Sequence, residues 1–468
     1  CEATHVRHEQ SDVLLDRRMA CLDRAATSFG WVLSETIEAQ DGEYVLAALP
    51  DLQVCAGLLE GVEPIPETAR SLANDLERWS VALQLASSAP SADEVASMRT
   101  RAAATGHHGL HVDAQLVAGS ASAARGDWTT SEAETQEALL LAEAQTDPGR
   151  VARAWLQAAR ISGERGRYAE AEERARHAVA QADRAGERQL SIRAGLVRVI
   201  ALTHLERFDR ATGVLAALND QEDVDPLLAA RIETSRGDLL RRRAFCDEAL
   251  VAHERALELD RSELGPTHPR LARHHHNRGG VLRESGRLEE AREAYEAALA
   301  LWPPASLGFA RTTNSLGLVD RTEGQPARAR ERFERAFEIL TALEHADASQ
   351  PRFNLAKLDI DGDDPGHGLA SLQALLAEVE PRFGESSRVL EIRMAMAEAC
   401  DGLDRPEDAR AERLGAAALA ERLGRDDIAE TIRATGPMAA AEAPVETATA
   451  VQDAPTPMRR VRTRPGVE

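Results

Sequence analysis

The hydrophobic pattern of the chain repeats in a unit of roughly 40 residues. In the clear copies, the second residue after a glycine is a bulky residue or Pro326. Small residues then stand three and ten positions after this bulky residue or Pro326. The clear copies begin at Gly126, Gly166, Gly286 and Gly324. A glycine permits a tight turn, and small residues let two helices approach closely. The unit therefore predicts a hairpin of two helices.

Weaker copies fill the gaps between the clear ones. The residues that mark them are Phe208 with Ala211 and Leu218, Gly237 with Ala249 and Ala256, Ala356 with Gly368 and Leu375, and Ala397 with Ala409 and Ala416. Taken together, the copies predict about eight hairpins, which stack into an all-α solenoid over residues 106–435.

The two ends of the chain do not follow this repeat. Apolar residues at helical spacing predict helices over residues 11–39, 43–56 and 67–85, and one more that ends near residue 104. We expect residues 1–105 to be a helical region that links to and caps the solenoid. Residues 436–468 lack apolar periodicity and are rich in Ala, Pro, Thr and Glu, so we expect a disordered tail.

Several repeats resemble the tetratricopeptide repeat (TPR) family. The residues that carry the resemblance are Trp155 and Ala159 before Tyr168, Asn277 and Gly279 with Tyr295, Leu316 and Gly317 with Phe333, and the stretch 264–291, which is similar to repeats of kinesin light chains. The resemblance covers roughly residues 107–424. It implies a right-handed solenoid in which the first helix of each hairpin lines a concave groove that binds proteins or peptides.

A second resemblance concerns residues 1–55. Cys1-Glu2-Ala3-Thr4, residues 14–22, and Ala48-Leu49-Pro50 with Cys55 are similar to a segment of large bacterial serine/threonine kinases that precedes C-terminal TPR repeats. The resemblance implies that the chain is the regulatory part of such a kinase, tethered to the inner membrane by an upstream segment. The alternative is a cytoplasmic location.

Composition excludes several enzyme classes for this chain. It has one lysine, Lys357, and no glycine-rich loop precedes it, so a P-loop, a kinase catalytic domain and a Schiff-base lysine are excluded. No Gly-x-Ser-x-Gly or His-Glu-x-x-His motif occurs. We therefore expect no enzyme and no cofactor.

The net charge of −22 argues against nucleic acid as a partner, and no apolar run is long enough to span a membrane.

The cysteines leave three interpretations open. Cys1, Cys21 and Cys55 are small buried hydrophobic residues, or Cys21 and Cys55 form a disulfide if the first two helices fold back on each other. The chain begins at Cys1 rather than Met, which indicates processing or a longer parent protein. A lipid-modified Cys1 would make the chain a lipid-anchored TPR lipoprotein.

The histidines form two clusters, at 107–111 and at 274–276. His107 and His111 share one helix face, but neither cluster has the cysteine or carboxylate neighbours that a structural metal site usually has. We expect both clusters to lie on solvated helix surface and predict no metal.

Arginines recur at one position of the first helix in five successive repeats. We call Arg153, Arg193, Arg231, Arg273 and Arg311 the arginine column. Arg241, Arg283 and Arg321 follow at the ends of the same helices. The column either pairs with acidic residues of neighbouring helices or forms a basic strip in the groove.

The second interpretation predicts a function. A basic groove would bind an acidic, extended segment of a partner, and His276, Asn277 and Asn314 would add hydrogen bonds to it. We expect a scaffold or sensing region for protein–protein interaction. An alternative is a peptide-responsive regulator whose solenoid changes pitch when the ligand binds. The oligomeric state is not predicted by the sequence.

Overall fold

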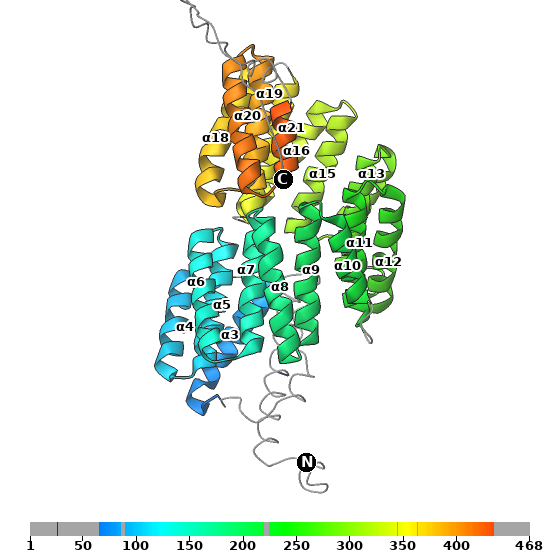
Figure 1. Cartoon of the computed structure of the whole chain (residues 1–468). Coiled ribbons are helices and arrows are strands. Elements are labelled where there is room, and N and C mark those ends of the chain that lie inside the picture. The colour runs from blue at the N-terminus through cyan, green and yellow to red at the C-terminus, as the bar shows by residue number, and fades with distance from the viewer. Residues whose placement is uncertain are drawn as a thin grey trace, which may run out of the picture.

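The computed structural model describes residues 65–85, 89–219, 224–343, 345–362 and 364–434, together with residue 26. All regular structure in these ranges is helical (Figure 1). The helices before the repeats are η2 (Glu67–Ala69), α3 (Arg70–Leu85) and α4 (Ala92–Thr105). The predicted helices over 11–39 and 43–56, the possible Cys21–Cys55 disulfide and the tail 436–468 lie outside the described residues.

Eight hairpins follow within the described ranges, as the repeat predicts. Their first helices, here called A helices, are α5 (His108–Ala124), α7 (Pro148–Glu164), α9 (Arg188–His204), α11 (Pro226–Arg242), α13 (Arg270–Glu284), α15 (Leu307–Thr322), α17 (Ser349–Asp361) and α19 (Ser387–Gly402). Their second helices, the B helices, are α6 (Trp128–Ala144), α8 (Tyr168–Ala185), α10 (Phe208–Asn219), α12 (Cys246–Leu264), α14 (Leu288–Leu301), α16 (Pro326–Ala342), α18 (Pro365–Phe383) and α20 (Pro406–Arg422). A short helix η3 (Ala346–Ala348) precedes α17, and α21 (Asp426–Ala434) ends the described chain.

The predicted turn glycines adopt the left-handed backbone conformation between helices A and B. Gly126, Gly166, Gly286 and Gly324 have φ between 72° and 77°. In this region of φ an L side chain is strained, which explains why glycine marks the clear copies of the repeat. Capping residues define several helix starts: Asp147 caps α7 before Pro148, and its side chain accepts a hydrogen bond from the Arg150 backbone N–H.

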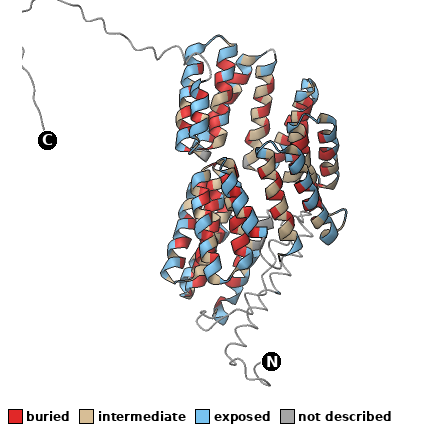
Figure 2. Ribbon diagram, turned by 45° about the vertical axis from the view of Figure 1, so that its right-hand side comes forward, coloured by how far each residue is buried: buried red, intermediate tan, exposed pale blue. Residues whose placement is uncertain are grey.

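The core is built on alanine between the paired helices, as predicted. The first small residue of each repeat is fully buried or nearly so, as in Ala171, Ala291 and Ala329, and so is the second, as in Ala178 and Ala298. Figure 2 shows the buried positions facing the neighbouring helix, with exposed positions on the outside. Small side chains permit this close approach, so a core with few aromatic residues still packs densely.

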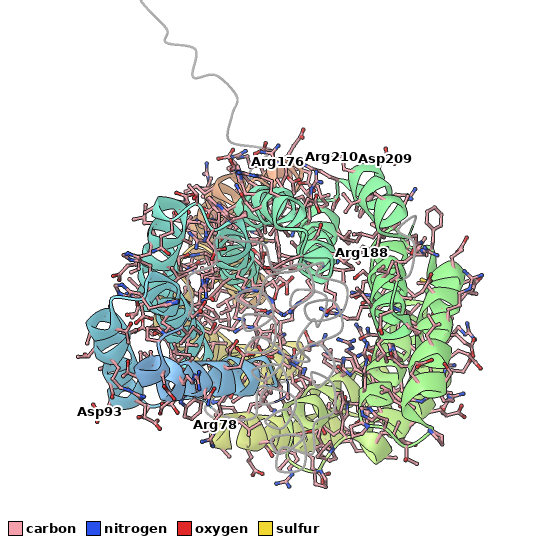
Figure 3. The ribbon with its side chains drawn as sticks, turned by 90° about the horizontal axis from the view of Figure 1, so that it is seen from below. Arg78, Asp93, Arg176, Arg188, Asp209 and Arg210 are labelled. Carbon is pink, nitrogen blue, oxygen red and sulfur yellow. The ribbon has the colours of Figure 1, made fainter. Side chains whose placement is uncertain are left out.

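The A helices line the inner side of the solenoid. Successive A helices contact one another, for example α5 with α7 and α7 with α9. In the view along the solenoid axis, Arg188 at the start of α9 points toward the centre, whereas Arg176 on α8 and Arg210 on α10 lie at the outer rim (Figure 3). Helices α3 and α4 pack on α5 through an apolar cluster that includes Leu76, Val95 and Leu110.

The solenoid turns far enough for its last repeats to meet its first three. In Figure 1 the bundle α18–α21 lies directly above α5–α8. Trp128 and Ile161 belong to the same buried apolar cluster as Leu390 and Leu423. The Arg425 guanidinium lies 3.3 Å from a carboxylate oxygen of Glu206, in the turn between α9 and α10. This closure contact, which the repeat pattern does not reveal, fixes the curvature of the inner face.

Candidate functional site

The arginine column lies on the A helices, one member on each of α7, α9, α11, α13 and α15. Arg153 and Arg311 keep about half of their side chains exposed, at 44% and 50%. The other three are partly exposed. The helices that carry these residues line the inner side of the solenoid.

The two ends of the column are paired with carboxylates. The Arg153 guanidinium donates hydrogen bonds of 3.0 and 3.1 Å to both oxygens of Glu187. Burial alone would lower the pKa of Arg153, but the carboxylates of Glu187, Asp113 and Glu77 together outweigh it and the pKa is raised. Arg311 donates to Asp347 over 2.7 Å from its Nε. For these two members, the pairing interpretation is confirmed.

The middle of the column is surrounded by positive charge. Burial, together with the nearby Arg160 and Arg153, lowers the pKa of Arg193 to about 10. Burial, together with Arg273, Arg193, Arg160 and Arg270, lowers the pKa of Arg231 to about 9. Arg231 has neither an ion pair nor a side-chain hydrogen bond to another described residue. Four A helices thus hold like charges close enough to repel one another.

The arginines at the ends of the A helices behave differently from the middle of the column. Arg241 donates hydrogen bonds of 2.7 and 2.9 Å to the carboxylate of Glu284. Arg283 donates to the same carboxylate over 3.3 Å. Arg321 is partly exposed in the last turn of α15. Glu284 is shared by Arg241 and Arg283, so its single negative charge offsets only part of the positive charge of these three arginines.

A cavity of about 230 Å³ lies beside the last member of the column. Its lining residues are His276, Arg311, Asn314, Ser315, Leu340, Asp347, Gln350 and Pro351. Three of the predicted residues, His276, Arg311 and Asn314, therefore meet at one place. The repeat pattern does not mark Asp347, Gln350 and Pro351, which lie just before or on α17 in a weaker copy, nor Leu340 on α16.

Hydrogen bonds fix the polar side chains of this cavity. The His276 ring nitrogen Nδ1 lies 3.0 Å from the Thr312 hydroxyl oxygen. Burial and the nearby Arg311 lower the pKa of His276 to about 4, so the ring is neutral at pH 7. The Asn354 amide donates to the Asn314 side-chain oxygen over 2.8 Å. Asn277 is partly exposed on α13 but does not line the cavity.

The expectation that both histidine clusters are solvated is wrong for two members. His107 is 4% exposed because it caps α5, where its ring accepts a hydrogen bond from the Leu110 backbone N–H. His274 is fully buried against the carboxylate of Asp260, 2.6 Å away. His108 is exposed as expected.

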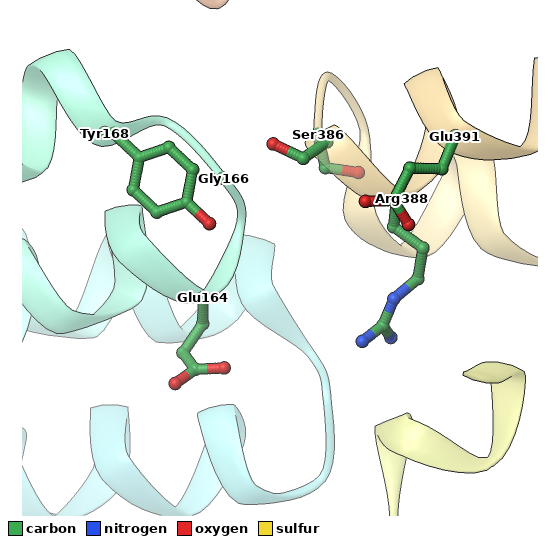
Figure 4. A pocket seen from close by; sticks show the side chains of 7 residues that line it. Glu164, Gly166, Tyr168, Ser386, Arg388 and Glu391 are labelled. Carbon is green, nitrogen blue, oxygen red and sulfur yellow. The ribbon is translucent and has the colours of Figure 1, made fainter. Parts of the chain in front are cut away.

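A second cavity, of about 130 Å³, lies at the closure contact. It is lined by Glu164, Gly166 and Tyr168 from the α7–α8 corner and by Ser386, Ser387, Arg388 and Glu391 at the start of α19 (Figure 4). Burial raises the pKa of Glu391. The Tyr168 ring stacks on His204, with 4.1 Å between ring centroids. The cavity is polar and joins segments that are distant in the sequence.

Metal ligands, membrane-spanning helices and free thiols bear on other functions. In the described ranges, no group of three or more His, Cys, Asp or Glu side chains is arranged to hold a metal ion. None of the helices in these ranges is long and apolar enough to cross a membrane. Cys246 and Cys400 are free thiols, and burial raises the pKa of Cys400.

Comparison with known proteins agrees with this fold. The tetratricopeptide repeat family model matches residues 228–303, which include α12, α13 and α14. A Rap protein complexed with Competence and Sporulation Factor has a TM-score of 0.53 at 15% identity, over 86% of this chain and 99% of that chain. The fold is thus a TPR-type α-solenoid with a tetratricopeptide repeat match at its centre. No curated protein matches the chain in sequence.

Two further solved structures are less similar. The apo form of the quorum sensor NprR from B. thuringiensis has a TM-score of 0.40 at 15% identity, over 75% of this chain and 99% of that chain. The STAND protein PH0952 from Pyrococcus horikoshii, which has a tetratricopeptide repeat sensor, has a TM-score of 0.43 at 12% identity, over 82% of this chain and 57% of that chain.

Proposed function

We propose that the chain is a binding scaffold whose inner face captures acidic, extended peptide segments. The observation that carries this proposal is the group of like charges around Arg231, on four neighbouring A helices. Repulsion among arginines costs folding free energy, and a bound carboxylate would relieve it. Guanidinium groups also match carboxylates in bidentate geometry. The Rap protein with this fold was crystallised with a bound factor, which is in keeping with such a use.

The cavity beside Arg311 would serve as a specificity pocket for the same ligand. Leu340 and Pro351 supply apolar surface, while Gln350 and Arg311 supply polar groups. A peptide lying along the A helices would then present acidic groups to Arg231 and one side chain to this cavity. The expected ligand is therefore acidic over one part and amphipathic over another.

A labelled hexaglutamate peptide tests the charge requirement directly. We expect Arg231→Glu to weaken its binding at least tenfold in fluorescence anisotropy, because one charge-assisted hydrogen bond contributes about 1.5–3 kcal/mol. Arg255→Glu is the matched control, since Arg255 is an exposed arginine on the outer helix α12. Equal weakening by both variants would show that only net charge matters and would overturn the proposal.

A peptide-responsive regulator is a second proposal, favoured by the closure contact. The α7–α8 corner meets the start of α19 through polar residues around a small cavity, and this part of the contact can open more easily than the apolar part around Trp128 and Ile161. Opening it would change the pitch of the solenoid. Small-angle scattering with and without the hexaglutamate peptide tests this, and an unchanged radius of gyration at saturation would favour a rigid scaffold.

The kinase context is a further proposal that rests on the resemblance of residues 1–55 alone. Only residue 26 of this stretch is among the described residues. The coding sequence upstream of Cys1 tests it: a kinase domain with a membrane helix would support a regulatory kinase region. A lipoprotein signal before Cys1 would instead support the lipid-anchored alternative.

A further inference from the structure

The sequence before α3 has an unusual charge distribution. Between Ala25 and Pro64 there is no Lys, Arg or His, and the carboxylates are Glu35, Glu38, Asp41, Glu43, Asp51, Glu60 and Glu63. We call residues 35–63 the acidic segment. The other terminal stretches are nearly balanced: residues 1–24 hold five carboxylates and four arginines, and residues 435–468 hold four of each.

The acidic segment joins the described structure beside the arginine column. Helix α3 follows it almost directly and packs on α5, the first A helix. Glu77 on α3 is one of the carboxylates that raise the pKa of Arg153, so α3 is within electrostatic range of the first member of the column. About 29 residues of chain can span up to about 100 Å. The segment is therefore long enough to follow the column from α7 to α13.

We propose that the acidic segment binds the inner face of its own chain, against the middle of the arginine column, and competes there with acidic ligands. This proposal rests on the proposed function, since both need the inner face to bind carboxylates. Charge complementarity selects the acidic segment over the C-terminal tail, and tethering raises its effective concentration at the column. An external ligand must then displace it, so the segment sets a threshold for ligand binding.

The position of the segment can be measured without any ligand. In the full chain, Tyr44 or Leu52 is replaced with the photocrosslinker p-benzoylphenylalanine, and the crosslinked peptides are identified by mass spectrometry. We expect crosslinks to α9, α11 and α13, and fewer of them in the Arg231→Glu variant. The same crosslinker at Val451 in the tail is the control. Crosslinks confined to the outer B helices, crosslinks between two chains, or equal labelling from Val451 would overturn the proposal.

The competition is measured separately with the hexaglutamate peptide. Changing all seven carboxylates of the segment to amides, as in Glu43→Gln and Asp51→Asn, should tighten hexaglutamate binding by the full chain at least tenfold. An unchanged affinity would overturn the competition. If neither chain binds hexaglutamate, the proposed function fails, whereas the crosslinks still decide whether the segment occupies the inner face.

Discussion

A methyl group on Gly166 would lie 2.8 Å from the backbone nitrogen of Ser387, although the two residues belong to opposite parts of the solenoid. Gly166 also has a φ of 74°. Glycine is therefore required here for two reasons: the turn between α7 and α8 needs the left-handed conformation, and the start of α19 needs the space.

Gly166→Ala should separate these two effects when compared with Gly286→Ala. Gly286 has a φ of 77°, but nothing lies near its missing side chain. Both variants should lose about 1–2 kcal/mol of unfolding free energy from the strained backbone. Only Gly166→Ala should also open the closure contact, increasing the radius of gyration and the amide exchange at the start of α19. Identical scattering from the two variants would contradict this.

The repeat pattern predicted the hairpins because it depends on local contacts. Turn glycines and small residues act within one hairpin, so their spacing is visible in the sequence, and Ala291 and Ala298 are buried as expected. The closure contact joins Trp128 and Ile161 to α18–α21 across most of the chain. Such a contact depends on the summed curvature of many repeats, and no periodic signal marks it.

The arginine column was predictable as a set of positions but not as a set of partners. Arg153 pairs with Glu187 at the edge of the next repeat, a contact that depends on how neighbouring A helices are offset. The side chains that lower the pKa of Arg231, namely Arg273, Arg193, Arg160 and Arg270, are all positively charged. The sequence shows the shared position, whereas the charge environment depends on side chains from three other helices.

Arg231→Gln should stabilise the unliganded protein while weakening anion binding. Burial and the neighbouring arginines lower the folded-state pKa of Arg231 to about 9, so the charged form that predominates below that pH opposes folding. Removing one charge should raise the unfolding free energy by about 0.5–1 kcal/mol, the range for single charge pairs near a surface. Urea unfolding at pH 7 measures it. Arg255→Gln is the control, and equal stabilisation by both variants would point to net charge instead.

Asp260 should be essential to the stability of the central repeats. Its Oδ2 accepts hydrogen bonds of 2.6 Å from Arg270 Nε and His274 Nε2, and all three side chains are buried. Asp260→Asn would remove the buried carboxylate that Arg270 and His274 both contact, at a cost of about 3–5 kcal/mol. Asp247→Asn, at a side chain that is 94% exposed, should change the unfolding free energy by less than about 0.5 kcal/mol. A loss below 1 kcal/mol for Asp260→Asn would show that the pair is not needed.

His253 occupies a place that aromatic residues fill in the next two repeats. Its ring packs against Gly237 as Tyr295 packs against Gly279 and Phe333 against Gly317. His253 is fully buried, and neither ring nitrogen has a hydrogen-bond partner in the described structure. Burial lowers its pKa to about 3, with nearby positive charges adding to the effect. The folded protein therefore keeps this ring neutral at the cost of two unsatisfied nitrogens.

His253→Phe should stabilise the protein by about 1–3 kcal/mol at pH 7, because it removes buried polar atoms without partners. The advantage should grow in acid. Between pH 6.5 and 3 the unfolded chain binds a proton at His253 that the folded chain does not, so native stability falls as pH falls. At pH 4.5 this loss is about 2–3 kcal/mol, and the variant lacks it. Urea unfolding at pH 7 and 4.5 measures the difference, with the exposed His108→Gln as control. A difference between variant and native protein that is the same at both pH values would show that His253 does not resist protonation.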